Sequence, residues 1–249
     1  VREMPSPARV AFVTAVAVAL VGAPVAEAGA RKKKTKKRGK QAKVTQPRSK
    51  RTNMPTGWTW PPSKAMVEAG KVCTDELDTL GIAWKPAAKA RKVATPITLP
   101  DMELGGVKLV SVYRRGPHVM DCALALGLAR HLPALHAVGV RELHFSRIHE
   151  YSKVRVNGKQ LRSLSRHALG LAIDVRSFVD DDGRKALVLD DYPLGDALLL
   201  DAEQALGDSG GFRTILTPRN DPQSHDDHFH LEVRVDYTAP PATPRKPAT

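Results

Sequence analysis

Two short segments in the C-terminal half of the sequence bring imidazole and carboxylate side chains to spacings that suit a metal site. In the first, His167 precedes residues 171–178, where apolar and polar side chains alternate, and Asp174 lies within that stretch. In the second, His228 and His230 are two residues apart, and residues two apart in a strand point to the same face. Histidines and a carboxylate that converge on one ion are a common ligand set for zinc. The sequence therefore predicts a zinc site.

A zinc site of this kind can support hydrolysis. Catalytic zinc is held by three protein ligands, and the fourth position is left to a water molecule whose pKa the metal lowers to roughly 7. The positive charge that remains at the metal polarises a carbonyl group and stabilises the oxyanion formed when that group is attacked. Taken singly, His167 would be a core histidine and Asp174 a strand residue paired with Arg176. Their clustering with His228 and His230 favours the metal site.

The residues of these two segments match a known pattern. Residues 165–174 follow S-x-H-x-x-G-x-A-x-D, and residues 228–230 follow H-x-H. The pattern resembles that of the zinc peptidases grouped with D-alanyl-D-alanine carboxypeptidases and lysostaphin-type enzymes. The closer resemblance is to the extensin-like C-terminal family of bacterial proteins, over roughly Lys71 to Val235. It implies an α+β fold in which a small antiparallel sheet is flanked by helices and carries a zinc cleft.

The resemblance also implies roles for individual residues. It makes His167, Asp174 and His230 the ligands of one Zn²⁺ ion per chain. It makes Ser165 and Gly170 the supports of the turn that aims His167.

Hydrolysis also requires a general base. Related peptidases take it either from an acid three residues before the last ligand or from the first histidine of H-x-H, and these positions hold Asp227 and His228. A carboxylate that is hydrogen-bonded to the metal-bound water can take its proton and pass it to the leaving amine. This favours Asp227, with His228 as the alternative on the same face as His230.

Several polar residues near these segments are weaker candidates. Arg147 and Tyr151 fall where relatives bring polar residues to the cleft, and an arginine there can hold a peptide carboxylate bidentately or form a surface salt bridge. Arg166 stands where relatives often carry an acid, which predicts an altered rim of the site. His225 and Asp226 lie in a polar loop and are expected to serve the turn.

The elements that must position these residues can be predicted from the spacing of apolar side chains. Helices are expected after a Ser63 cap up to Gly81, from Pro117 to about Pro133, and over residues 194–206. Strands are expected over residues 107–112, 141–145, 171–178 and 228–235. Helices and strands alternate irregularly and show no parallel βαβ rhythm, so the sequence predicts an α+β fold.

The sequence contains two cysteines, Cys73 and Cys122, each on the inward face of an expected helix. In an oxidising compartment such a pair can form a stabilising bridge. We favour a disulfide over two buried free thiols, because two cysteines in an exported chain most often pair.

The N-terminal part of the chain has a different composition. Arginines precede an apolar run over residues 10–21, and an Ala-Glu-Ala cleavage site follows at residues 26–28, which is typical of a secretory signal. The run is shorter than the ~20 residues of a spanning helix, although retention as an anchor is the alternative. We expect a signal peptide over residues 1–28, a basic disordered linker over 29–60, a zinc peptidase-like domain over 61–237 and a Pro-rich tail over 238–249.

The formal net charge of +13 comes almost entirely from the linker, because residues 31–51 contain twelve Lys or Arg residues and no acid. A run of this kind is usually solvated, and it can bind anionic envelope polymers through counterion release. Nucleic acid is not an expected partner, because an exported protein has little access to it.

Three functions are compatible with these features. The first is a zinc peptidase of the periplasm or cell envelope that hydrolyses amide bonds in peptidoglycan stem peptides or cross-links, as an endopeptidase or a carboxypeptidase. The second is a module that binds wall peptides and zinc without turnover. The third is an adaptor that binds polyanions through residues 31–51. We expect the peptidase, because the resemblance and the export signal jointly imply it.

Overall fold

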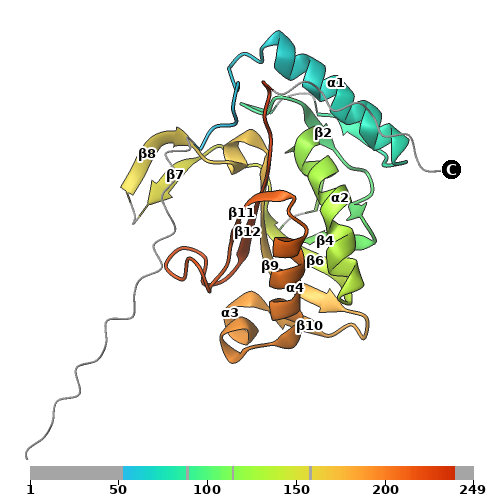
Figure 1. The fold of residues 1–249 in the computed structure, drawn as a ribbon, viewed down its shortest axis with the longest axis vertical. Coiled ribbons are helices and arrows are strands. Elements are labelled where there is room, and N and C mark those ends of the chain that lie inside the picture. The colour runs from blue at the N-terminus through green and yellow to red at the C-terminus, as the bar shows by residue number, and fades with distance from the viewer. Residues whose placement is uncertain (1–52, 88–89, 114, 157–158, 239–249) are drawn as a thin grey trace, which may run out of the picture. The chain divides into compact units, whose positions relative to one another are not determined.

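The structure is a computed structural model of the 249-residue chain. It describes residues 53–87, 90–113, 115–156 and 159–238. These residues form helices and several sheets, shown in Figure 1. The mixed α+β class and the mainly antiparallel strand pairing agree with the expectation from the sequence.

The described residues contain four α-helices and two short 3₁₀ helices. The first helix begins after Ser63, whose side-chain oxygen accepts a hydrogen bond from the backbone N–H of Met66, as the sequence predicted. The helices are α1 (Lys64–Thr79), α2 (Cys122–Ala137), α3 (Val188–Asp191), α4 (Ala197–Asp208), η1 (His167–Leu169) and η2 (Tyr192–Leu194).

The largest sheet has seven strands in the order β11-β12-β9-β6-β4-β3, with β10 paired to β9. Strand β9 (Ala172–Asp180) lies between β12 (Phe229–Val233) and β6 (Val140–Arg147) and is antiparallel to both. The other strands of this sheet are β3 (Glu103–Leu104), β4 (Val107–Ser111), β10 (Lys185–Leu187) and β11 (Phe212–Leu216).

One pair of strands in this sheet is parallel. Strands β4 and β6 run in the same direction, and α2 lies between them in the chain, so the connection is a βαβ crossover. A single crossover produces no repeating rhythm in the sequence, which is why the parallel pair was not expected.

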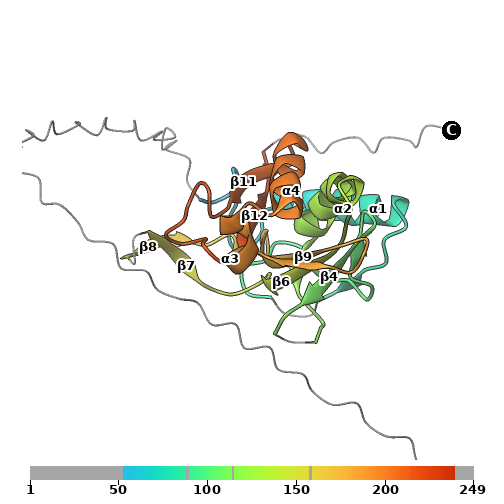
Figure 2. The ribbon, with the colours of Figure 1, turned by 90° about the horizontal axis from the view of Figure 1, so that it is seen from below.

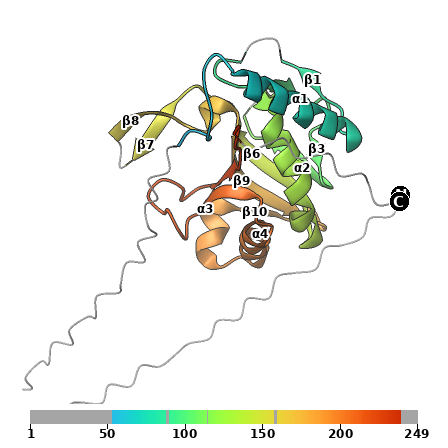
Figure 3. The ribbon, with the colours of Figure 1, turned by 45° about the horizontal axis from the view of Figure 1, so that its top comes forward.

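Two small sheets complete the described strands. Strand β2 (Pro96–Thr98) pairs with both β1 (Lys85–Pro86) and β5 (Met120–Asp121). Strands β7 (Lys153–Val156) and β8 (Lys159–Leu164) pair only with each other. This hairpin extends away from the large sheet (Figures 1 and 3).

The buried core lies where α2 and α4 pack against the large sheet (Figure 2). Leu124, Leu128 and Leu132 recur at four-residue spacing on α2 and are fully buried. On the sheet, Ile173 and Leu231 are cross-strand partners and are also fully buried. Burial of an aliphatic side chain contributes about 1.5–3 kcal/mol, so this layer holds β9 and β12 in register.

Helix α2 differs from the prediction at both ends. It begins at Cys122 instead of Pro117, because Asp121 Oδ1 accepts a hydrogen bond from Ala123 N at 3.0 Å and caps the helix. It continues through Pro133 to Ala137, although an interior proline removes a backbone donor. Leu132 and Leu135, on either side of the proline, are fully buried, and their packing in the core outweighs that local preference.

The predicted disulfide between Cys73 and Cys122 is confirmed. It joins α1 to the first residue of α2, across 49 residues of sequence. The preceding residue, Asp121, donates its backbone N–H to the carbonyl oxygen of Gly170 at 3.0 Å. The disulfide is therefore adjacent to the residue that contacts the η1 turn.

The folded unit begins before the boundary expected at residue 61. Trp58 packs against the core, and Thr56 forms a parallel bridge with Asp236. The expected signal peptide, the linker up to residue 52 and the tail from residue 239 lie outside the described residues. Within the described residues, no helix is long and apolar enough to cross a membrane.

Candidate metal centre

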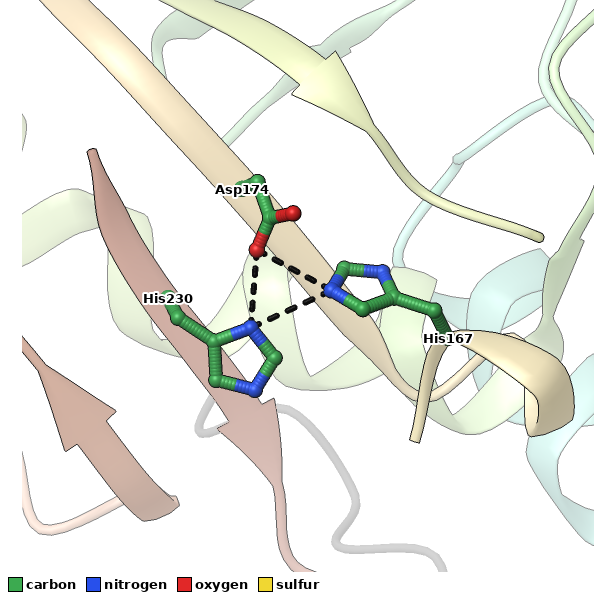
Figure 4. A group of neighbouring side chains, drawn as sticks. All are labelled: His167, Asp174 and His230. Atoms are coloured by element: carbon green, nitrogen blue, oxygen red, sulfur yellow. Dashed lines mark hydrogen bonds and ion pairs between the residues drawn. The ribbon is translucent and has the colours of Figure 1, made fainter. Parts of the chain in front are cut away.

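Three residues that are far apart in the sequence meet in the structure (Figure 4). His167 comes from η1, Asp174 from β9 and His230 from β12. Asp174 and His230 are cross-strand partners, so their side chains lie on the same face of the sheet. One potential ligand atom from each of the three residues lies within 4.8 Å of the other two, and all three side chains are buried.

Each imidazole of the cluster has an inner and an outer nitrogen. The inner nitrogens, His167 Nε2 and His230 Nδ1, lie 3.0 and 2.7 Å from Asp174 Oδ1 and 3.1 Å from each other. The outer nitrogens face acceptors: His167 Nδ1 is 2.8 Å from the carbonyl oxygen of Ile148, and His230 Nε2 is 3.2 Å from Glu232 Oε1.

The outer acceptors decide which nitrogens carry protons. A carbonyl and a carboxylate can only accept, so each neutral imidazole donates its one N–H outward, His167 to Ile148 and His230 to Glu232. The two inner nitrogens then present lone pairs to the carboxylate of Asp174. Three acceptors this close together repel one another unless a proton or a metal cation lies between them. The donor set therefore fits a metal ion bound by two imidazoles and one carboxylate.

The pKa values of Asp174 and His230 also indicate that a positive charge is stable at the cluster. Burial acts to raise the pKa of Asp174, but the close interactions with the two imidazoles, His167 and His230, outweigh it and hold this pKa well below its usual value. Burial acts to lower the pKa of His230, but Asp174 and Glu232 outweigh it and raise this pKa to about 9. Without a metal, His230 therefore keeps a proton at neutral pH.

Glu232 is the residue of this site that the sequence did not identify. It lies two residues after His230 in β12, is only 6% exposed, and forms an ion pair with Arg213 of β11. Burial acts to raise the pKa of Glu232, but the hydrogen bond from His230 and the charges of the nearby arginines lower it to about 2. A lone acid two residues after a ligand histidine, on the same face of a strand, is the sequence signal that could have found it.

The sequence predicted that Arg166 lies on the rim of the site, but the structure places it in the interior. Its side chain is 2% exposed, and its Nε and Nη1 atoms have no hydrogen-bond partner in the part of the chain that is described. Burial lowers the pKa of Arg166 to about 10, and the nearby charge of Glu232 opposes this.

Ser165 and Gly170 lie at the two ends of η1, and each makes close contacts there. Ser165 Oγ accepts a hydrogen bond from Ala168 N at 3.1 Å and lies 2.7 Å from Ser152 Oγ. Gly170 ends the turn with a φ of 68°. A Cβ atom at Gly170 would lie 2.7 Å from the backbone nitrogen of Asp121. Both the left-handed conformation and the close approach therefore require glycine.

The two candidates for the general base lie together beside the cluster. His228 Nδ1 is 2.5 Å from Asp227 Oδ1, and His228 Nε2 is 3.6 Å from Asp174 Oδ1. Asp227 also accepts a hydrogen bond from Arg176 at 2.6 Å. The imidazole of His228 therefore separates Asp227 from the cluster. Arg176 pairs with Asp227, so the alternative in which it pairs with Asp174 does not occur.

His225 lies closer to the site than the sequence suggested. Its ring centroid is 4.8 Å from that of His228 and 5.4 Å from that of His230. Its Nδ1 atom is 3.0 Å from Asp221 Oδ2, which anchors the ring within the loop. Asp226 is exposed, as expected for a turn residue.

Of the two predicted substrate residues, only Arg147 reaches the cluster. Its Nε atom lies 3.8 Å from Asp174 Oδ2 and 2.9 Å from Glu150 Oε2. Tyr151 instead packs its ring against the guanidinium group of Arg91, 3.8 Å from the ring centroid.

The sequence matches the family model described as extensin-like protein C-terminus over residues 71–239. The chain belongs to the extensin-like family. The matched range of this extensin-like chain includes both segments of the cluster, from Ser165 to Asp174 and from Asp227 to Glu232. A search of curated proteins and a search of solved structures each found no match.

The close approach at Gly170 leads to a prediction about stability. Gly170 and Gly183 both have a positive φ, but a Cβ atom at Gly183 would meet no atom within 4 Å. We expect Gly183→Ala to lower the free energy of unfolding by roughly 1–2 kcal/mol through backbone strain alone. Gly170→Ala should cost about 1–3 kcal/mol more, because of the clash with Asp121. Denaturant unfolding measures both, and equal losses would contradict the role given to this contact.

Proposed function

We propose that this extensin-like protein is a zinc-dependent peptidase that hydrolyses amide bonds in the stem peptides or cross-links of peptidoglycan. The observation that carries the proposal is the buried convergence of His167, Asp174 and His230, in which the outer nitrogen of each imidazole faces an acceptor and the inner nitrogen faces Asp174. The resemblance of residues 165–174 and 228–230 to the pattern of D-alanyl-D-alanine carboxypeptidases and lysostaphin-type zinc peptidases supports the reaction class.

The proposed metal ligands are His167 Nε2, Asp174 Oδ1 and His230 Nδ1, the three atoms that face one another. Zinc bound there would polarise the scissile carbonyl and lower the pKa of water to roughly 7. Ile148 and Glu232 keep the two imidazoles in the tautomers that leave the inner nitrogens free.

We assign proton transfer to His228 and the orientation of its ring to Asp227. The sequence favoured Asp227 as the base, but the carboxylate of Asp227 is occupied by Arg176 and by His228 Nδ1. His228 Nε2 is the free nitrogen that faces the cluster. It accepts a proton from the attacking water and delivers it to the amine nitrogen as the amide bond breaks, while Asp227 accepts the Nδ1–H hydrogen bond.

Arg147 is the proposed contact for a substrate carboxylate. Its side chain is 47% exposed and lies beside Asp174, so it is open to solvent next to the reacting groups. Guanidinium groups bind carboxylates bidentately. A substrate carboxylate would compete with Glu150, whose salt bridge with Arg147 is exposed and therefore weak.

Export to the periplasm or cell envelope is part of the proposal. The N-terminal apolar run with its cleavage site supports it, and the disulfide fits an oxidising compartment. The basic residues 31–51 would hold the protein near anionic envelope polymers. Nucleic acid is not an expected partner.

The peptidase activity can be tested with the full chain, one equivalent of zinc and purified peptidoglycan, with new amines and released fragments identified by mass spectrometry. We expect His228→Asn to lower kcat by about 10²–10⁴-fold, because the base is lost. Asp227→Asn should lower it less, since the imidazole remains in place.

A matched control is His144→Asn. His144 is also bonded to an acid, Glu142, at 2.8 Å, but it lies on β6 outside the cluster and should keep full activity. If the zinc-loaded chain releases no amine from any wall preparation, the protein is a binding module and not a peptidase. If Asp227→Asn lowers kcat more than His228→Asn does, the base is Asp227.

Glu232 should control how tightly the site holds zinc. We expect Glu232→Ala to weaken zinc affinity by roughly 10–100-fold, because His230 then loses the acceptor that fixes its tautomer. Glu232→Gln keeps an acceptor oxygen and should be weakened less. A competition titration with a chromophoric chelator measures both.

The matched control for Glu232 is Glu203→Gln. Glu203 is also part of a polar network, with Tyr192 and Thr217, but it does not touch the cluster. Its substitution should leave zinc affinity unchanged. Equal affinities for wild type and Glu232→Ala, with both folded by thermal melting, would exclude the role given to Glu232.

A further inference from the structure

The β7–β8 hairpin carries an unbalanced positive charge. Four basic residues, Lys153, Arg155, Lys159 and Arg162, have exposed side chains. The sequence has no acid from residue 151 to residue 173. None of the four forms an ion pair with any residue that the structure describes. The hairpin is therefore a basic arm whose charges are directed to solvent.

Stability of the domain does not account for this composition. The two strands pair only with each other, and a two-stranded hairpin is at best marginally stable in water. Leu164, at the end of β8, packs against the core, and its carbonyl oxygen accepts a hydrogen bond from Asn53 at 2.6 Å. Leu161, closer to the tip, is 41% exposed. Like charges along such a ribbon repel one another and oppose its formation.

The base of the hairpin is attached to the candidate metal centre. Strand β8 ends three residues before His167. The backbone N–H of Ser165 is bonded to the carbonyl oxygen of Ser152 at 3.0 Å, which joins the two sides of the hairpin at its base. The backbone N–H of Glu150 is bonded to the carbonyl oxygen of His167 at 3.3 Å. The arm is thus held at a fixed place relative to the first proposed zinc ligand.

We propose that the β7–β8 hairpin is a docking arm for the carboxylates of peptidoglycan stem peptides. The inference rests on the proposed function, because a peptidase that acts on peptidoglycan at the cluster binds its substrate next to the base of the hairpin. Strand β8 has six residues, a length of roughly 20 Å. The four basic side chains are therefore spread along an arm long enough to contact carboxylates other than those bound at the cluster. Charge complementarity at exposed groups mainly guides the encounter and selects the partner.

The test compares two variants of the full chain that each lose four positive charges. The arm variant carries Lys153→Gln, Arg155→Gln, Lys159→Gln and Arg162→Gln. The tail variant carries Lys32→Gln, Lys33→Gln, Lys34→Gln and Lys36→Gln, and so has the same net charge. Affinity for fluorescent, soluble peptidoglycan fragments is measured by anisotropy with zinc removed, so that no bond is cleaved. The fragments are used with free carboxylates and after amidation of those carboxylates.

We expect the arm variant to bind the free-carboxylate fragments roughly tenfold more weakly than wild type, from four exposed charge contacts. Amidated fragments should bind wild type and arm variant alike, and the tail variant should keep most of its affinity for both. Wild-type affinity in the arm variant, or equal losses in the arm and tail variants, would overturn the proposal. Because zinc is absent, these results are independent of turnover. A protein that binds through the arm and releases no amine would refute the peptidase alone.

Discussion

Two imidazole nitrogens and one carboxylate oxygen meet at separations of 2.7–3.1 Å in a buried position, and such a meeting requires a positive charge among them. In the metal-free chain a proton on His230 supplies that charge, and in the proposed enzyme Zn²⁺ replaces it. The surrounding residues are compatible with this exchange. The acceptors outside the cluster direct the N–H groups of His167 and His230 outward, and Arg213 keeps Glu232 in place as one of those acceptors.

The fold supplies this meeting point through two constraints. The first is the register of β9 and β12. In this register the buried pair Ile173 and Leu231 is adjacent to the pair Asp174 and His230. A shift of one residue would move the apolar pair out of the core, so core packing also fixes the distance between the two proposed ligands. The second is the η1 turn that carries His167. Gly170 closes it against the backbone of Asp121, the residue before Cys122, which is joined by the disulfide to α1.

Features set by local spacing could be predicted from the sequence, and features set by tertiary contacts could not. The alternation around Asp174 located β9, Ser63 marked the start of α1, and the paired cysteines indicated the disulfide. The limits of α2 were wrong because the Asp121 cap and core burial outweigh two prolines. The buried positions of Glu232 and Arg166 depend on which strands are neighbours, and a single sequence does not reveal this. The strands β7 and β8 were not predicted, because their residues are mainly basic and polar. The Asn157-Gly158 pair between them is a known turn signal.

X-ray absorption at the zinc edge, on the full chain loaded with one equivalent of zinc, tests the central claim most directly. It reports the elements bound to the metal and their distances without depending on substrate or turnover. We predict two imidazole nitrogens at about 2.0–2.1 Å and oxygen at about 2.0–2.2 Å, with no sulfur. A His167→Ala variant should lose one of the imidazole contributions or fail to hold the metal. A spectrum of hydrated zinc without imidazole, or one with a sulfur ligand, would contradict the assignment of His167, Asp174 and His230 as a zinc site.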